Sequence, residues 1–413
     1  METYGKILLI AMPAFLLLVL VEKWYGWYTG RDTYRNLDMI SSLSSGITNV
    51  TKDVLGLSVA ILSYGWMVEH LAVVHVKQSF LTYAIAFLAL DLSGYWVHRI
   101  NHEYNLFWNA HIIHHSSEEY NLACALRQSI SVFFRLFTFF LLPAAILGVP
   151  PQVIAITAPL HLFAQFWYHT RHIGKMGLLE KIIVTPSHHR VHHAINPEYI
   201  DKNYSQIFIF WDKLFGTFQP ELANVEPVYG ITRPVRTWNP IKINFMHISL
   251  LLRDAWHAQN WSDKVKIWFM PTGWRPADVA ARHPIVKIGD VNHYTKFDTP
   301  ASMSLHLWSW VQITVTLLLV SYLFGNIALI NQLHPWKIYL YGLMIFLSVY
   351  AYTDLMDRNA SALIVESIKN ILGLAILIQS GDWFGISRWW SGFTVLIGSY
   401  FIISTIVTAS LAG

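Results

Sequence analysis

The chain has 413 residues, of which 54% are hydrophobic and only 13% are charged, and its formal net charge is +4. These figures fit a polytopic membrane protein and disfavour a soluble domain of this length, and the small positive charge includes no basic tract of the nucleic-acid-binding type. The single cysteine, Cys124, excludes an intramolecular disulfide and a cysteine-rich metal site. Any metal site in this chain must therefore use nitrogen and oxygen ligands.

Three apolar segments lie in the first hundred residues. Residues 6–22 contain an apolar run that aromatic residues follow, with no small-residue cleavage site, so we expect a retained membrane helix and not a signal peptide. A second segment covers about 43–66, although polar residues dilute its first half, and a third covers 80–97. Each has roughly the ~20 residues that a helix needs to cross a ~30 Å hydrocarbon core.

Three short motifs that follow carry nine of the twenty histidines. Spacings of three and four residues place side chains on one face of a helix, and neutral imidazole is the commonest metal ligand in proteins. So many rings exceed the four ligands of one zinc ion and suit a pair of transition metal ions. The expected ligands are His98, His102, His111, His114, His115, His189, His192 and His193. His188 would point about 100° away from its neighbour on a helix, and we expect it to be only a neighbour of the site.

Two further apolar segments, 130–149 and 152–168, lie between the second and third motifs and are separated by Pro150 and Pro151. Consecutive prolines break a helix, so we expect a pair of helices that dips through the bilayer and returns to the face it left. All three motifs then lie on one face with most of the basic loop residues, and the positive-inside tendency makes this face cytoplasmic. His169, at the end of this pair, is expected to be a ninth ligand.

Two acidic residues beside the first motif are the candidate catalytic residues. Asp91 lies on the helical stripe that continues to His98 and His102, and an ionisable residue inside a membrane segment is a candidate for function. We expect its carboxylate to accept the N–H of a ligating imidazole, the alternative being a pairing with a polar group of another helix. Glu103 directly follows His102, where it would orient a ligand, relay a proton, contact a substrate headgroup or be an ordinary exposed glutamate.

The second half of the chain is first polar and then apolar. Residues 219–302 are rich in proline and mixed in charge, and we expect them to form a cytoplasmic cap over the metal site. Four apolar segments follow, at about 303–330, 336–353, 361–380 and 389–412. The sequence thus predicts an all-α bundle of membrane helices with a histidine-rich site for two metal ions. Its expected parts are N-terminal membrane helices, a catalytic core, the cap and C-terminal membrane helices, over 1–78, 79–218, 219–302 and 303–413.

The histidine motifs resemble those of the fatty acid hydroxylase/sterol desaturase superfamily. The segments HIIHHSSEEYNLACALRQS (111–129), QFWYHTRHIGKMGLLEKIIVTPSHHRVHH (165–193) and NPEYIDKNYSQIFIFWDKLFGTF (196–218) are similar to its alkylglycerol monooxygenase branch. The resemblance implies a membrane enzyme that uses O₂ and two iron ions, held by the eight motif histidines, to hydroxylate an unactivated C–H bond of a lipid. In this branch that bond is at the ether-linked carbon of alkylglycerols. It also implies an external reductant, which is tetrahydrobiopterin in the animal enzymes of the branch and cytochrome b5 or ferredoxin in more distant relatives.

Other functions stay open on the sequence. A sterol or fatty acyl hydroxylase or desaturase of the same superfamily would have the same ligand set. A non-enzymatic protein that moves metal ions or protons across the bilayer is disfavoured, because the histidines lie at one face and only Asp91 is a clear charge within a span. The expected partners are a lipid substrate, O₂, the membrane and an electron-donor protein, and no nucleic acid.

Overall fold

The computed structural model describes residues 2–60, 62–132, 134–135 and 137–412, and these residues are mostly helical. Six of the described helices are long and apolar enough to cross a membrane. They are α1 (Glu2–Thr29), α4 (Phe80–Glu103), α14 (Met303–Gly325), α16 (Lys337–Met356), α17 (Ser361–Ser380) and α18 (Gly392–Ala412). This architecture confirms the prediction of an all-α, multi-pass membrane protein.

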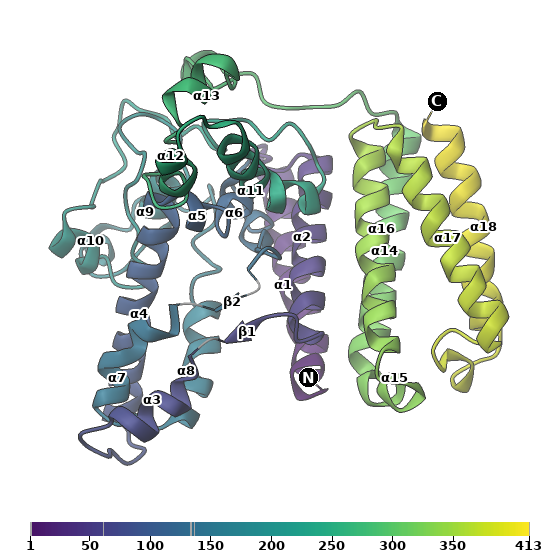
Figure 1. Cartoon of the computed structure of the whole chain (residues 1–413), viewed down its shortest axis with the longest axis horizontal. Helices are drawn as coiled ribbons and strands as arrows, with labels where there is room; N and C mark the ends of the chain where they lie inside the picture. Colours follow the sequence, from purple (N-terminus) through teal and green to yellow (C-terminus); the bar gives the residue numbers. More distant parts are fainter. Residues whose placement is uncertain (1, 61, 133, 136, 413) are drawn as a thin grey trace.

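Two groups of helices stand side by side (Figure 1). In one of them α4 packs against α8 (Pro151–Phe163), while α3 (Tyr64–Leu71) and α7 (Leu142–Ile146) lie at its lower end. In the other, α14, α16, α17 and α18 pack with one another, and α1 and α2 (Asn36–Val54) pack against α14. The N-terminal helices therefore share a core with the C-terminal ones, and that core includes Val19, Ile40, Val320 and Ile345.

The predicted membrane span over about 43–66 is wrong, because α2 begins earlier and ends at Val54. Gly56 follows with a φ of 66°, a left-handed conformation that turns the chain away from the helix axis. The helix is rich in serine and threonine, and its buried hydroxyls pack against protein: Ser44 Oγ lies 2.6 Å from the hydroxyl of Tyr352 on α16. Small polar residues allow this close approach between helices.

The segment 130–149 is also not the helix that we expected. Its described residues contain the two-residue strand Phe134–Arg135, the 3₁₀ turn η2 (Phe137–Leu141) and the short α7. Backbone groups at its start bind side chains of other elements, since Ser129 O accepts the amide of Asn49 and Ile130 N donates to Asn244. These bonds replace the ladder of a helix. From α7, at the lower end, the chain returns upward through α8, which packs against α4 (Figure 1).

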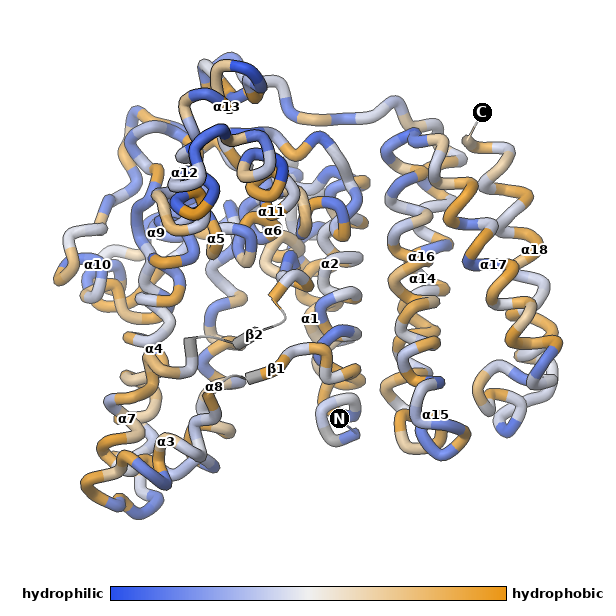
Figure 2. The backbone as a smooth tube through the Cα atoms, in the orientation of Figure 1, coloured by the Kyte–Doolittle hydropathy of each residue, from blue (hydrophilic) through white to orange (hydrophobic). Residues whose placement is uncertain are grey.

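The cap covers one end of the α4 group. It contains α11 (Pro240–His257), α12 (Trp261–Lys266), α13 (Ala277–Arg282) and the 3₁₀ turn η4 (Val291–His293). Figure 2 shows that hydrophilic residues concentrate at this end, whereas the helices below are mostly hydrophobic. Asn105 fastens the cap to the end of α4, because its amide donates to the carbonyls of Ile267 at 2.9 Å and Trp274 at 3.0 Å.

The remaining elements are short. Strands β1 (Val59–Ala60) and β2 (Phe134–Arg135) form a two-residue parallel pair. The short helices and 3₁₀ turns are α5 (Asn105–Trp108), α6 (Ile112–His115), η1 (Cys124–Leu126), η3 (Gly177–Lys181), α9 (Pro186–His192), α10 (Phe210–Phe215), α15 (Ile327–Leu333) and η5 (Ile386–Arg388).

Candidate metal centre

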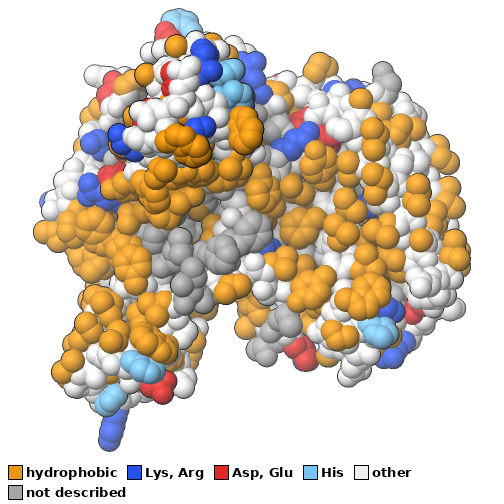
Figure 3. Space-filling view, viewed as in Figure 1, with side chains coloured by type: hydrophobic (Ala, Val, Ile, Leu, Met, Phe, Trp, Pro, Cys, Tyr) orange, Lys and Arg blue, Asp and Glu red, His pale blue; other side chains and the backbone are white. Residues whose placement is uncertain are grey.

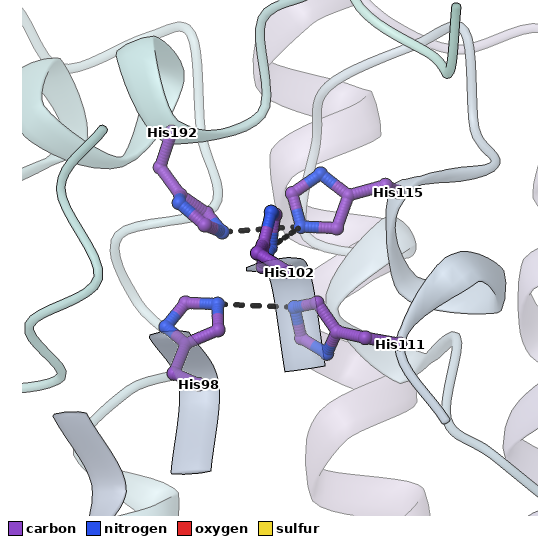
Figure 4. Close-up of side chains that lie close together, drawn as sticks. All are labelled: His98, His102, His111, His115 and His192. Atoms are coloured by element: carbon purple, nitrogen blue, oxygen red, sulfur yellow. Dashed lines mark hydrogen bonds between the residues drawn. The ribbon is translucent and has the colours of Figure 1, made fainter. Parts of the chain in front are cut away.

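All nine histidines that the sequence marked as ligands meet beneath the cap, where they form two groups. Within each group the ligand nitrogens all lie within 4.8 Å of one another. The first group consists of His98, His102, His111, His115 and His192 (Figure 4). The second group consists of His114, His169, His189 and His193. The site therefore has the two centres that a pair of ions requires.

The helical spacing of each motif determines which group a histidine joins. Residues four apart share a helix face, so His111 and His115 both join the first group, and His189 and His193 both join the second. His114 directly precedes His115 but joins the second group, and His192 directly precedes His193 but joins the first. The second and the third motif therefore each contribute to both centres, and this links the two groups through the short helices α6 and α9.

The imidazole nitrogens within each group converge at short distances. In the first group Nε2 of His98 lies 3.0 Å from Nε2 of His111, and Nε2 of His115 lies 3.1 Å from that of His192. In the second group Nε2 of His189 lies 2.9 Å from that of His169. Two imidazole nitrogens bound at ~2.1 Å to one ion, at about a right angle, are about 3.0 Å apart. The spacing fits ligands of a shared ion.

Backbone carbonyls fix the tautomer of several of these rings. The Nδ1 of His98 lies 2.7 Å from Tyr204 O, and the Nδ1 of His192 lies 2.9 Å from Lys202 O. The Nδ1 of His114 bonds Arg127 O at 3.3 Å. A neutral imidazole that donates its Nδ1 proton keeps a lone pair on Nε2, which is the atom that faces the centre.

The facing nitrogens of His114 and His169 show whether these residues could hold a cation. Both rings direct Nδ1 at backbone carbonyls, so both Nε2 atoms carry lone pairs, and these two atoms are 3.4 Å apart. Two acceptors at this distance cannot form a hydrogen bond with each other. A transition metal ion that prefers imidazole would receive both lone pairs, so the residues present fit such an ion.

Burial keeps these imidazoles neutral. It lowers the pKa of His114 to about 3, with a further contribution from neighbouring His169, and it lowers the pKa of His169 to about 3. At neutral pH both rings are therefore uncharged, which is the form that binds a metal ion.

His188 stands outside both groups. Its Nδ1 accepts the backbone N–H of Thr185 at 3.4 Å, as part of the capping box at the start of α9. Burial lowers its pKa to about 4, so it is neutral as well. Its contacts are those of a helix cap, in line with the expectation that it is only a neighbour of the site.

Asp91 does not contact the rings of either group, contrary to the contact that we expected. Its buried carboxylate accepts four hydrogen bonds, from His161 Nε2 at 2.9 Å, the backbone N–H groups of Ile207 and Phe208, and Trp211 Nε1. The arrangement matches the alternative given by the sequence, in which Asp91 pairs with a polar group of another helix, here His161 of α8. Asp91 lies about two turns from His98 on α4, so it reaches α8, the loop before α10 and the first turn of α10, but not the rings of the two groups.

Glu103 has the geometry of an ordinary surface ion pair. Arg99 Nε donates to its carboxylate at 2.8 Å, and the Glu103 side chain is 36% exposed. A carboxylate that does lie close to a ring of the first group belongs to Asp201, whose Oδ1 is 3.5 Å from His102 Nδ1. Asp201 is in a left-handed conformation, with a φ of 58°, and its sequence neighbours give no ligand spacing that would reveal this contact.

Asp212 is a supporting residue that the sequence did not indicate. Its buried carboxylate accepts the backbone N–H groups of Tyr204 at 2.8 Å and Ser205 at 2.9 Å, as well as the hydroxyl of Thr217 at 2.7 Å. Burial raises its pKa, against the effect of these bonds. The carbonyl of Tyr204 in turn accepts His98 Nδ1, so Asp212 orients a ring of the first group from the opposite side of a loop.

Arg127 plays the corresponding part for the second group. Its side chain is almost fully buried and donates to Asp38 at 2.7 Å, Ser42 at 2.9 Å and Ser116 at 2.7 Å. These bonds hold its own carbonyl against His114 Nδ1. The contact with Asp38 is a buried salt bridge.

Comparisons with known proteins agree with this site. The fatty acid hydroxylase family model matches residues 83–217. The chain is 34% identical to alkylglycerol monooxygenase from Homo sapiens, over 89% of this chain and 81% of the relative, and 34% identical to that from Danio rerio, over 88% and 80%. It is 29% identical to an ornithine lipid hydroxylase from Rhizobium tropici, over 34% of this chain and 43% of the relative. No solved structure matches the chain.

Proposed function

The chain belongs to the alkylglycerol monooxygenase family, and from this premise we propose that it hydroxylates the ether-linked carbon of alkylglycerols with a pair of iron ions. The observation that supports the proposal most is the convergence of nine imidazoles on two centres beneath the cap. Nitrogen ligands of this kind suit iron, and zinc or copper would bind them too. The choice of iron therefore depends on the oxygenase relatives.

Each histidine group would hold one ion. When bound, the ion pair supplies the redox chemistry with O₂ that removes hydrogen from an unactivated C–H bond, which no side chain of the protein can supply. The carbonyls of Tyr204, Lys202 and Arg127 keep the Nδ1 protons in place, and so keep Nε2 available as a ligand.

Aromatic rings enclose the site and keep water away from it. Trp108 packs edge-on against His102, with ring centroids 5.0 Å apart, and Tyr120 lies 5.3 Å from His193. The Tyr120 hydroxyl donates to Tyr168 O at 2.9 Å, so its polar end is satisfied within the protein. Exclusion of water limits side reactions during O₂ chemistry.

The overall reaction balances with two external electrons. One oxygen atom of O₂ enters the C–H bond, and the other leaves as water after it takes up two protons and two electrons. The product carries a hydroxyl on a carbon that also bears the ether oxygen. Such a hemiacetal separates into an aldehyde and a glycerol without further catalysis. We propose tetrahydrobiopterin, or an electron-donor protein such as cytochrome b5 or ferredoxin, as the source of the electrons, and the cytoplasmic face as the location of the site.

A second candidate is hydroxylation of another membrane lipid. The ornithine lipid hydroxylase and a sterol desaturase from Gibberella zeae match only 34% and 35% of this chain, whereas the alkylglycerol monooxygenases match most of it. The wider match includes the cap and C-terminal helices. It favours the alkylglycerol as substrate.

Mass spectrometry of the lipids of expressing cells tests the proposal. Cells that express the chain should lose alkylglycerols and gain the corresponding aldehyde, while cells that express the His192→Ala variant should resemble cells without the protein. A new hydroxyl on an acyl chain or a sterol, with the alkylglycerols unchanged, would overturn the choice of substrate. Unchanged lipids in cells whose purified protein holds iron would overturn the proposed activity.

A further inference from the structure

The cap carries an apolar surface that no other described part of the chain covers. Leu252 and Trp256 lie four residues apart on α11, and Trp261, Val265 and Phe269 follow at the same interval on α12 and just after it. All five side chains are exposed, Trp256 at 81% and Trp261 at 79%. We name these five residues the cap face. Figure 3 shows hydrophobic side chains gathered over this part of the cap.

The two helices present the cap face together. Lys264 Nζ donates to the carbonyl of Trp256 at 3.1 Å and lies 5.3 Å from the centroid of the Trp261 ring. The end of α11 and the start of α12 are therefore joined where the two tryptophans project. Large apolar side chains that remain exposed on adjoining helices mark a binding surface.

The backbone attaches the cap face to the end of a membrane span. The N–H groups of Asn105 and Leu106 donate to the carbonyls of Met270 at 3.1 Å and Trp268 at 3.0 Å, and Thr272 N donates to Glu103 O at 3.0 Å. Glu103 is the last residue of α4. The cap face thus lies at the level where α4 leaves the bilayer, and tryptophan is enriched at that level of membrane proteins.

Charge around the cap face is mainly positive. Arg253, Lys264 and Lys266 flank it, and Asp254 is buried in a salt bridge with Arg275. On α12 itself, Asp263 is the single acidic residue. Cations beside an apolar helix face attract anionic lipid headgroups near the membrane surface.

We infer that the cap face inserts into the headgroup region of the same bilayer that the six spans cross, and that it prefers anionic lipid. A helix pair with an apolar face and flanking cations lies in the plane of the interface in this way. Because the cap face is bonded to the end of α4, its insertion holds His98 and His102 at the depth of the lipid headgroups. This inference concerns the position of the cap and does not depend on the reaction.

Site-specific nitroxide labels on the full-length protein test the inference. Cys124 is buried and is the single cysteine, so a Cys124→Ala background accepts one new label at a time. Val265→Cys places a label on the cap face, and Ala281→Cys, on the exposed part of α13, is the matched control. In nanodiscs of phosphatidylcholine and phosphatidylglycerol, the label at 265 should lose contact with a water-soluble nickel chelate and gain contact with oxygen. The label at 281 should do the reverse.

Three outcomes would overturn parts of the inference. If the label at 265 meets the nickel chelate as readily as the label at 281, the cap face is not in the lipid. If its protection requires two copies per nanodisc, the cap face is an interface between copies. Protection should decrease in phosphatidylcholine alone, and Lys264→Gln with Lys266→Gln should remove that difference. Equal protection in both lipids would overturn the preference for anionic headgroups.

Discussion

An offset of one residue decides which centre each imidazole joins. His114 and His115 are neighbours in sequence, yet their Nε2 atoms face different groups, and the same holds for His192 and His193. Neighbouring positions on a helix point about 100° apart, so a pair of adjacent histidines reaches two ions where a single one reaches only one. The adjacent histidines in the second and third motifs thus allow one short helix to contribute to both groups.

The first prediction concerns one ligand of each group. His192→Ala and His114→Ala should each lower the metal content of the purified protein and abolish turnover, because the remaining rings leave a ligand position open. Elemental analysis and lipid turnover are the measurements. His188→Gln is the control, because His188 is as buried as His192 but belongs to neither group. This variant should retain its metal content and its turnover. Wild-type activity in both alanine variants would contradict the assignment of ligands.

The second prediction separates a supporting carboxylate from an exposed one. Asp212→Asn weakens the hold on Tyr204, whose carbonyl orients His98, so metal affinity should fall by about 10–100-fold. Asp263→Asn, on the exposed part of α12, should leave the affinity unchanged. Competition with a chelator measures both. Equal retention of metal in the two variants would assign Asp212 a role in folding alone.

At the scale of the elements, buried polar groups connect helices of the C-terminal bundle. Glu366 and Lys369 of α17 are almost fully buried and lie 2.8 Å apart, and Asn370 bonds both Glu366 and Ser404 of α18. Tyr400 donates to Gln312 of α14. In a bilayer such bonds join helices that the hydrophobic effect alone does not hold together. The sequence alone predicted membrane helices here but not these contacts between them.

The third prediction follows from this ion pair. Lys369→Met leaves the Glu366 carboxylate buried without its partner, and the free energy of unfolding should fall by about 3–5 kcal/mol. The double variant Lys369→Met with Glu366→Gln removes both charges and should recover most of that loss. Unfolding of detergent-solubilised protein measures the two variants. A single variant as stable as the wild type would show that water reaches the pair.

At the scale of the whole molecule, the histidine groups lie between the cap and the α4 group of helices. The cap is attached on both sides, to α4 through Asn105 and to the C-terminal bundle through Asp357, which accepts the N–H of Trp238 at 2.6 Å. The loop that follows α6 also contacts the cap, since Lys296 pairs with Glu119 at 2.7 Å. The cap therefore has contacts with both groups of helices and with a loop next to the second histidine motif.

The fourth prediction tests the attachment of the cap to α4. Asn105→Ala removes bonds to the carbonyls of Ile267 and Trp274 and to the N–H of Gly273, each contributing about 1 kcal/mol. Amide exchange of residues 267–274 should become faster, while that of α16 should not change. The exposed Asn292→Ala is the control. If the variant exchanged at the wild-type rate, other contacts would be holding the cap.

The sequence by itself indicated the membrane class, a metal site without cysteine ligands and the nine histidines that the structure brings together, because hydropathy and helical spacing are local properties. It also indicated the family, through segments that contain the motifs. Only the tertiary structure decided the contacts between segments distant in sequence. The structure divides the histidines into two groups. It pairs Asp91 with His161 and not with a ring of either group, and it shows that Asp212 holds the loop that orients His98. It also ended α2 at Val54, where a left-handed glycine and packing against α16 outweighed an apolar segment. Such outcomes depend on which partner each side chain meets, and spacing along a chain does not encode that.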